Sequence, residues 1–158
     1  MAIKIIKLKP NAMIPSYQTA GAAGLDIHAC LDAPKTLQPM ERALIPTGLA
    51  VELPPSTELQ IRARSGLSIK NGITMVNGVG TVDSDYRGEI GVLLINLGNE
   101  PFVIEPNMRI AQMVLARYEK VVWQETNSLL ETDRGAGGYG STGMGDAPVN
   151  IDTTSQKY

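Results

Sequence analysis

Short apolar segments, interrupted every few residues by glycine or proline, make up most of this 158-residue chain. The 16 glycines and ten prolines leave little room for helices, and this pattern is typical of an all-β domain. From Thr57 to Ala63 apolar and polar residues alternate, which predicts a strand with one face buried. We expect a loop to begin directly afterwards, at Arg64.

Two further segments are predicted to be strands. The segment from Ile90 to Leu97 is almost entirely apolar and rich in branched residues, so we expect a strand buried on both faces. The segment from Arg109 to Trp123 fits helical as well as strand spacing, and we favour a strand. Between apolar residues, Asn77 to Gly80 reads NGVG and predicts a hairpin turn, because Asn-Gly supplies the positive φ angles of primed turns.

The hydrophobic pattern stops at Glu131 and glycines become frequent, so we predict a β domain over residues 1–130 and a flexible tail over 131–158. Within the tail, RGAGGYGSTG spans Arg134 to Gly143 and is typical of a phosphate-binding loop. Its glycines let backbone N–H groups approach an anion, and its arginine offers a planar pair of donors. A flexible linker is the alternative. The strand and helix that a dinucleotide-binding fingerprint requires are not predicted around it.

Charge and cysteine content narrow the function classes. Fourteen Lys and Arg against 16 Asp and Glu give a net charge of −2, which argues against a general nucleic-acid surface, so any phosphate binding must be local. One cysteine and no secretory pattern favour a cytoplasmic protein. No apolar run approaches the ~18 residues of a membrane span, so we expect no membrane partner.

Two aspartates are candidates for chemistry. Asp83 lies just before the predicted buried strand, where a rigid element would hold it as a general base, although a turn aspartate is an equal alternative. Asp26, in AGAAGLDIHA, could orient a hydrated cation, but by itself a turn aspartate is the simpler interpretation. His28 and Cys30 are too few for a zinc site, and we expect them to pack ordinarily.

Taken in order, five segments resemble the five motifs of the homotrimeric dUTPase family. They are AGAAGLDIHA, RARSGLSIKNGI, NGVGTVDSDYRGEIGV, RIAQMVLARYE and RGAGGYGSTG. The resemblance covers most of the chain. It implies a jelly-roll-like β barrel, a homotrimer whose subunits share each active site, and Mg²⁺-dependent hydrolysis of dUTP to dUMP and pyrophosphate. That reaction keeps uracil out of DNA and supplies dUMP for thymidylate synthesis.

The resemblance also implies roles for individual residues. Asp83 corresponds to the general base, and Tyr86 to the tyrosine that lies against the deoxyribose. The other substrate-binding positions of the third motif, which receive uracil, correspond to Asn77, Gly80, Thr81, Val82 and Gly91. Those of the second and fourth motifs, which contact the triphosphate, correspond to Arg64, Ser65, Gly66 and Gln112. Asp26 corresponds to an aspartate that contacts Mg²⁺ through water, with no direct protein ligand expected.

The fifth motif corresponds to a lid from another subunit. Its substrate-binding positions are Arg134, Tyr139, Gly140, Ser141 and Thr142. Tyr139 stands where the family usually has phenylalanine, and Ala63 where it usually has proline; neither change removes a reacting group. Two rivals remain, a dCTP deaminase on the same fold and a nucleotide-sensing regulatory protein. RSGL in the second motif and VDSDY in the third favour dUTP hydrolysis.

Overall fold

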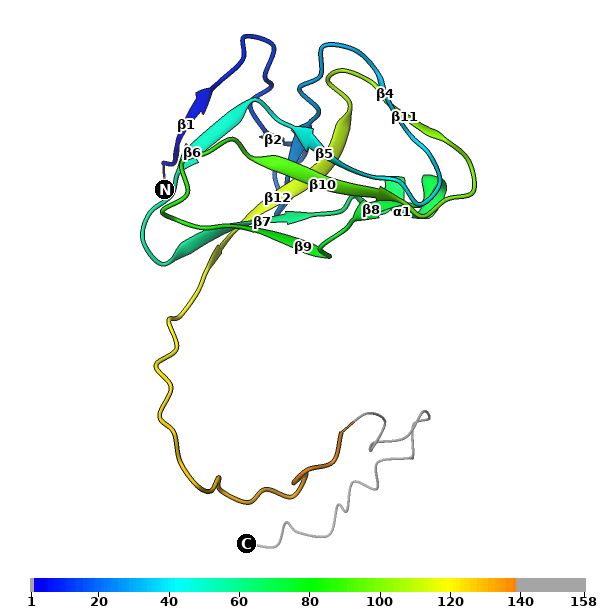
Figure 1. The fold of residues 1–158 in the computed structure, drawn as a ribbon. Coiled ribbons are helices and arrows are strands. Elements are labelled where there is room, and N and C mark those ends of the chain that lie inside the picture. Colours follow the sequence, from blue (N-terminus) through cyan, green and yellow to red (C-terminus); the bar gives the residue numbers. More distant parts are fainter. Residues whose placement is uncertain (1, 139–158) are drawn as a thin grey trace, which may run out of the picture. The chain divides into compact units, whose positions relative to one another are not determined.

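The computed structural model describes residues 2–138 and is built almost entirely from strands (Figure 1). The chain divides into a body, Met1–Val121, and a second unit, Val122–Tyr158. One helix, α1 (Ser65–Asn71), is present among the described residues. The strands are β1 (Lys4–Lys7), β2 (Ser16–Tyr17), β3 (Leu25–His28), β4 (Lys35–Leu37), β5 (Arg42–Pro46), β6 (Leu49–Glu52), β7 (Thr57–Arg62), β8 (Ile73–Met75), β9 (Val79–Val82), β10 (Gly91–Asn96), β11 (Phe102–Ile104) and β12 (Arg109–Arg117). The expected β class, with few helices, is confirmed.

The body contains two larger antiparallel sheets and two smaller strand pairs. One has the strand order β2-β3-β12-β7-β9 and the other β5-β10-β8, and two-stranded pairs β1-β6 and β11-β4 complete the fold. Branched apolar side chains from both larger sheets form one buried core, as shown by Ile27, Ile61 and Val92. The strand β12 is nine residues long and pairs with β3 on one side and β7 on the other. It therefore joins the first, second and fourth motifs within one sheet.

The segments with clear alternation match the predictions. The strand β7 alternates buried and less buried residues. From Arg109 to Arg117 β12 confirms the strand favoured over a helix, but the predicted continuation to Trp123 is wrong, because no strand follows Arg117 within residues 2–138. The loop expected from Arg64 is wrong, because Arg64 is extended (φ −94°, ψ 124°) and leads directly into α1. The helix ends at Gly72, whose left-handed φ of 70° lets its N–H reach the carbonyls of Leu67 and Ser68.

The prediction that Ile90 to Leu97 is buried on both faces is wrong. In β10, Val92, Leu94 and Asn96 are buried, whereas Leu93 is 39% exposed. On the neighbouring strand Leu44, which pairs with Leu93, is 62% exposed. Within residues 2–138 no further layer covers this outer face, so β10 contributes to the core with one face only.

The hairpin predicted at NGVG is also wrong in its detail. A turn is present, since Gly78 N–H donates to Met75 O at 3.3 Å and Gly78 has a φ of +67°. Asn77 does not share the positive φ that a type I′ turn requires at both central positions. The physical reason is that β8 pairs with β10 and β9 pairs with β7, so the turn connects two different sheets.

The second unit has no helix or strand among its described residues, Val122 to Gly138. Arg134 Nε donates to Gly137 O at 3.0 Å, within a turn where Gly135 has a φ of +49°. The motif residues Tyr139, Gly140, Ser141 and Thr142 lie outside the described residues, and the boundary expected at residue 130 stays a prediction. In residues 2–138 we find no helix of the length and apolarity that crossing a membrane requires.

Candidate active site

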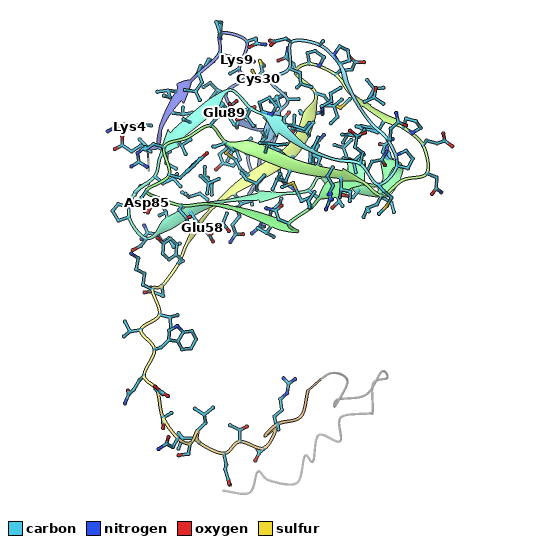
Figure 2. The ribbon with its side chains drawn as sticks, viewed as in Figure 1. Lys4, Lys9, Cys30, Glu58, Asp85 and Glu89 are labelled. Atoms are coloured by element: carbon cyan, nitrogen blue, oxygen red, sulfur yellow. The ribbon has the colours of Figure 1, made fainter. Side chains whose placement is uncertain are left out.

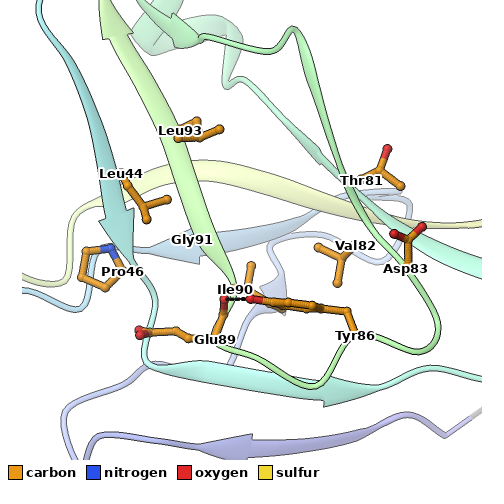
Figure 3. A pocket seen from close by; sticks show the side chains of 10 residues that line it. All are labelled: Leu44, Pro46, Thr81, Val82, Asp83, Tyr86, Glu89, Ile90, Gly91 and Leu93. Carbon is orange, nitrogen blue, oxygen red and sulfur yellow. Dashed lines mark hydrogen bonds between the residues drawn. The ribbon is translucent and has the colours of Figure 1, made fainter.

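A cleft of about 430 Å³ opens where β9 and β10 separate (Figure 3). It is named here the β9–β10 cleft. Its lining brings together five of the predicted site residues, three of them at the end of β9. The residues that line it are Leu44, Pro46, Thr81, Val82, Asp83, Tyr86, Glu89, Ile90, Gly91 and Leu93.

The cleft exists because its two walls belong to different sheets. Among the described strands, β9 is the edge of the five-stranded sheet and pairs with β7 alone. The strand β10 pairs with β8 only from Leu94 to Asn96. At Gly91 the edge of β10 that faces β9 therefore has no strand partner within residues 2–138. Edge strands carry unpaired N–H and C=O groups. The cleft therefore offers main-chain donors and acceptors to a ligand from both walls.

The loop between the two strands is held by its own hydrogen bonds. Tyr86 N–H donates to Asp83 O at 3.2 Å, and the Tyr86 hydroxyl donates to Glu89 O at 3.0 Å. The Tyr86 ring lies so close to Gly88 that a Cβ added there would be 2.6 Å from Cζ of the ring. At the end of the loop, Thr47 Oγ1 donates to Ile90 O at 2.6 Å. These contacts fix the ring along the floor of the cleft.

Two carboxylates line the cleft, and they differ in what they contact. Glu89 Oε1 accepts a hydrogen bond from Gly48 N–H at 2.7 Å, so this side chain anchors the β5–β6 connection. The exposed Asp83 side chain has no hydrogen bond or ion pair with any residue in 2–138. Figure 3 shows Asp83 at the end of β9, beside Thr81. Of the two, Asp83 is the one whose whole carboxylate is without a partner in residues 2–138.

Gly91 in the cleft lining and Gly80 next to it allow neighbouring groups to pack closely on the main chain. A Cβ at Gly80 would lie 3.2 Å from Ile61 Cβ and 3.4 Å from Asn77 Nδ2, so the Asn77 amide is packed against β9. A Cβ at Gly91 would lie 3.1 Å from Leu44 Cγ. Asn77 does not line the cleft itself but lies at the start of the same edge.

A second group of predicted residues surrounds Asp26. Arg64 Nε lies 3.2 Å from Asp26 Oδ1, and Arg109 Nη1 donates to Asp26 Oδ2 at 2.9 Å. Arg64 Nη1 also donates to the main-chain oxygen of Arg109 at 2.9 Å. We call these three residues the arginine cluster. With both arginines charged and one carboxylate, its net charge is +1, which suits an anion.

Gln112 and His28 flank the arginine cluster. Gln112 pairs with Asp26 across the β3–β12 ladder, and its Nε2 donates to Ala63 O at 3.0 Å, just before Arg64. Burial lowers the pKa of the His28 imidazole, and the neighbouring arginines lower it further, while Asp26 opposes them. His28 Nδ1 is buried without a hydrogen-bond partner in residues 2–138. The charge of this region therefore comes from the arginines.

Within one chain the predicted residues form two separate groups. Val82 pairs with Leu59, and Arg64 follows Leu59 by five residues of extended chain. At about 3.3 Å per residue this places Arg64 about 17 Å from Val82, with Asp83 one residue further away. Ser65 and Gly66 begin α1 and belong to the group around Arg64. Arg134 lies in the second unit.

Several residues of the site were not predicted from the sequence. Leu44 and Pro46 reach the cleft because β5 pairs with β10, a long-range pairing that no local pattern reveals. Gly88 and Glu89 follow Tyr86 within the quoted third motif, and Arg109 begins the quoted fourth motif. Membership of these motifs could therefore have marked Gly88, Glu89 and Arg109 as site residues. Their contacts could not be predicted from the sequence.

For a cation, the described residues offer little direct coordination. No group of three or more His, Cys, Asp or Glu side chains in residues 2–138 could hold a metal ion. Both Asp26 oxygens contact arginines, which leaves lone pairs that can accept a hydrogen bond from water. Cys30 is buried elsewhere, beside Lys9 in Figure 2, and its Sγ lies 3.3 Å from Asn11 Oδ1. Burial raises the pKa of this thiol.

Comparisons with known proteins agree with these motifs. The dUTPase family model matches residues 10–143. The deoxyuridine 5'-triphosphate nucleotidohydrolase of Rickettsia felis is 55% identical over 143 residues, 90% of this chain and 97% of its own length. The protein of the same name from Treponema denticola is 58% identical over 138 residues, 87% of this chain and 96% of its own length.

Solved structures support the fold. A mutant dUTPase of Staphylococcus bacteriophage 80alpha with dUpNHpp has a TM-score of 0.82 at 24% identity, covering 90% of this chain and 98% of its own. The dUTPase from phage phi11 of S. aureus has a TM-score of 0.74 at 21% identity, covering 82% and 98%. The family expected from the five motifs is confirmed, and with it the expected class of enzyme. This chain belongs to the dUTPase family.

Proposed function

We propose that this chain hydrolyses dUTP to dUMP and pyrophosphate, with Asp83 as the general base. The observation that carries the proposal is the β9–β10 cleft, where unpaired main-chain edges meet a free carboxylate at one rim. The family and the names of its relatives support the substrate. By removing dUTP, the enzyme keeps uracil out of DNA and supplies dUMP for thymidylate synthesis.

The cleft suits a uracil ring. Uracil presents two carbonyl oxygens and one N–H along its edge, and a strand edge such as β9 presents the complementary N–H and C=O groups. The Asn77 amide adds a polar side chain where this edge begins. Cytosine exchanges the pattern of donors and acceptors at two positions, which leaves buried groups unpaired and is disfavoured by several kcal/mol. The Leu44 side chain, packed against the main chain at Gly91, limits the room for an added methyl group on the base.

Tyr86 selects the sugar. Its ring lies along the cleft, and its hydroxyl is already engaged with Glu89 O, so the ring face is what a ligand meets. A deoxyribose packs on such a face, whereas the 2′-hydroxyl of a ribose is placed against it without a partner. The enzyme therefore prefers dUTP to UTP.

The phosphates bind to residues of a neighbouring subunit. Arg64, Ser65, Gly66 and Gln112 supply donors there. Within one chain Val82 and Arg64 lie about 17 Å apart along β7, so we assign the base-binding cleft and the phosphate-binding residues of one nucleotide to different subunits. A homotrimer of jelly-roll-like barrels, with the exposed face around Leu44 and Leu93 covered by another copy, brings the two groups together.

In the chemical step Asp83 accepts a proton from a water molecule whose oxygen attacks the α-phosphorus. The bond from this phosphorus to the bridging oxygen breaks, and pyrophosphate departs with that oxygen while dUMP remains. The arginine cluster stabilises the charge that develops on the departing phosphates. Arg134, Tyr139, Gly140, Ser141 and Thr142 of the fifth motif cover the nucleotide from another subunit and exclude bulk water.

Magnesium fits this site through the substrate. Bound with the substrate, Mg²⁺ would neutralise phosphate charge, and Asp26, whose oxygens retain lone pairs, would accept a hydrogen bond from a water molecule of the ion. A related fold, the dUTPase from phage phi11, has been described with a structural Mg(II) ion. The chain acts in the cytoplasm on a free nucleotide, without nucleic-acid or membrane partners.

A substrate panel tests the reaction. We expect release of pyrophosphate from dUTP in the presence of Mg²⁺, with much slower release from dCTP, dTTP and UTP. Release of ammonia from dCTP would instead identify a deaminase. Tight binding of dUTP without turnover would identify the regulatory alternative.

Mixing two inactive variants tests the shared site. Asp83→Asn removes the base, and Arg64→Ala removes a phosphate donor, so each pure variant is impaired. If Asp83 and Arg64 of one site come from different subunits, co-refolded equal mixtures regain about one quarter of the wild-type sites, because each intact contribution is present half the time. If one chain supplies both residues, the mixture shows no more activity than the average of the pure variants.

A further inference from the structure

Arg109 occupies a distinctive place in the arginine cluster. Its side chain donates to Asp26 Oδ2 at 2.9 Å, and its main-chain oxygen accepts from Arg64 Nη1 at 2.9 Å. Asp26 in turn lies 3.2 Å from Arg64 Nε. Arg64 is thus held from two sides, by the carboxylate that Arg109 holds and by the carbonyl of Arg109 itself.

We propose that Arg109 is a positioning residue of the phosphate site: it fixes Asp26, and through Asp26 the Arg64 guanidinium, in the orientation that meets the substrate's phosphates. This inference rests on the proposed function, which assigns Arg64 to the triphosphate. The Nη2 group of Arg64 donates no hydrogen bond to any residue in 2–138, so its two N–H groups remain for an anion. A planar guanidinium whose other edges are occupied keeps one direction for such contacts.

Charge gives Arg109 a second part in the same role. Asp26 is nearly buried, with 12% of its side chain exposed, so its negative charge acts strongly on its neighbours. Without the Arg109 side chain, Asp26 and Arg64 form a pair with no net charge, and the attraction of Arg64 for phosphate falls. With it, the cluster retains a charge of +1. Arg109 therefore keeps Arg64 both oriented and available.

Arg109→Ala tests the proposal, because the main-chain carbonyl remains and only the contact with Asp26 is lost. The non-hydrolysable analogue dUpNHpp carries the three phosphates, whereas dUMP lacks the two distal ones. We expect Arg109→Ala to weaken dUpNHpp binding about tenfold and to leave dUMP binding unchanged. Arg109→Lys, which keeps a charged donor, should weaken dUpNHpp binding less.

A double-variant comparison tests the route through Asp26. In an Asp26→Asn background the carboxylate that links the two arginines is absent, so adding Arg109→Ala should cause a clearly smaller loss of dUpNHpp affinity than it causes in the wild-type background. Two losses that multiply would overturn the proposal, since Arg109 would then act independently of Asp26. Arg117, at the other end of β12 and in no ion pair within residues 2–138, gives the matched control Arg117→Ala, for which wild-type dUpNHpp affinity is expected.

Two further binding results for Arg109→Ala would contradict the positioning role of Arg109. Unchanged dUpNHpp affinity in Arg109→Ala, or an equal loss of dUMP and dUpNHpp affinity, would overturn the positioning role. If Arg109→Ala fails to fold, Arg109→Gln, which removes the charge but keeps much of the side chain, replaces it: weaker dUpNHpp binding with normal dUMP binding supports the proposal, and unchanged dUpNHpp binding overturns it. Failure of the wild-type chain to release pyrophosphate from dUTP would reject the proposed function instead, so the two failures are distinguishable.

Discussion

The β9–β10 cleft and the arginine cluster are built on opposite physical principles. The cleft has main-chain edges, glycines and one aromatic ring, and its one free charge is the Asp83 carboxylate. The arginine cluster has three charged side chains that hold one another in place. A neutral base is selected by shape and hydrogen-bond pattern, whereas phosphates are attracted by charge. This division explains how a chain with a net charge of −2 can bind a polyanion.

The largest effect is expected from the free carboxylate of the cleft. Asp83→Asn keeps the size of the side chain but removes the proton acceptor, so turnover of dUTP should fall about 10²- to 10⁴-fold. Binding of dUpNHpp should persist, since shape and cluster charge are unchanged. Single-turnover assays and calorimetry measure the two quantities. Asp85→Asn, an exposed neighbour in the same loop, is the matched control and should keep the wild-type rate.

Loss of a charge in the arginine cluster should have the next largest effect. Here we expect weaker nucleotide binding, whereas Asp83→Asn should lower turnover and leave binding intact. Arg64→Ala should weaken binding of dUpNHpp roughly 10- to 100-fold, because charge-assisted hydrogen bonds are worth about 1.5–3 kcal/mol. Binding of dUMP should change little. Higher ionic strength should weaken wild-type dUpNHpp binding more than dUMP binding. An equal loss for both nucleotides in Arg64→Ala would contradict the division between cleft and cluster.

A smaller effect on activity is expected from Gly88, whose lack of a side chain lets the Tyr86 ring pack against it in the cleft. In Gly88→Ala the added methyl group meets the Tyr86 ring, which must move out of its position. We expect the ratio of kcat/KM for dUTP to that for UTP to fall about tenfold, since the sugar then meets a displaced ring. Gly21→Ala is the control, because a Cβ at Gly21 meets nothing within 4 Å. An unchanged ratio in Gly88→Ala would reject the role of the ring.

The sequence predicted what depends on local pattern. Alternation identified β7. Asp83 was expected just before the strand at Ile90, but it follows β9 directly and β10 begins only at Gly91. The sequence-based predictions failed where burial or position depends on residues far away in the chain. Nothing local shows that the outer face of Leu93 is left uncovered, or that β5 brings Leu44 to the cleft. The helix α1 was missed because it has seven residues and buries none of them, so no amphipathic pattern marks it.

The roles of the site residues were predicted from the order of the five motifs and not from local patterns. Asp26 alone was indistinguishable from a turn aspartate, and only the order of the five motifs implied a function for it. The structure then supplied the partners that a single sequence cannot show, since Asp26, Arg64 and Arg109 come from three elements far apart in the chain. Electrostatic pairing across a sheet depends on its register, and register is not readable from one strand.

The smallest effect is expected from Tyr86→Phe, which separates the ring of Tyr86 from its hydroxyl. The hydroxyl donates to Glu89 O at 3.0 Å and lies on an exposed loop, so its loss should amount to about 0.5–1.5 kcal/mol at most. The ring and its contact with Gly88 remain. The preference for dUTP over UTP should therefore fall only a few-fold, less than in Gly88→Ala, and dUpNHpp affinity should stay close to wild type. Tyr17→Phe, outside the cleft, controls for loss of a hydroxyl. A collapse of sugar discrimination in Tyr86→Phe would mean that the hydroxyl itself contacts the nucleotide, and the cleft would then select by a polar side chain as well as by shape.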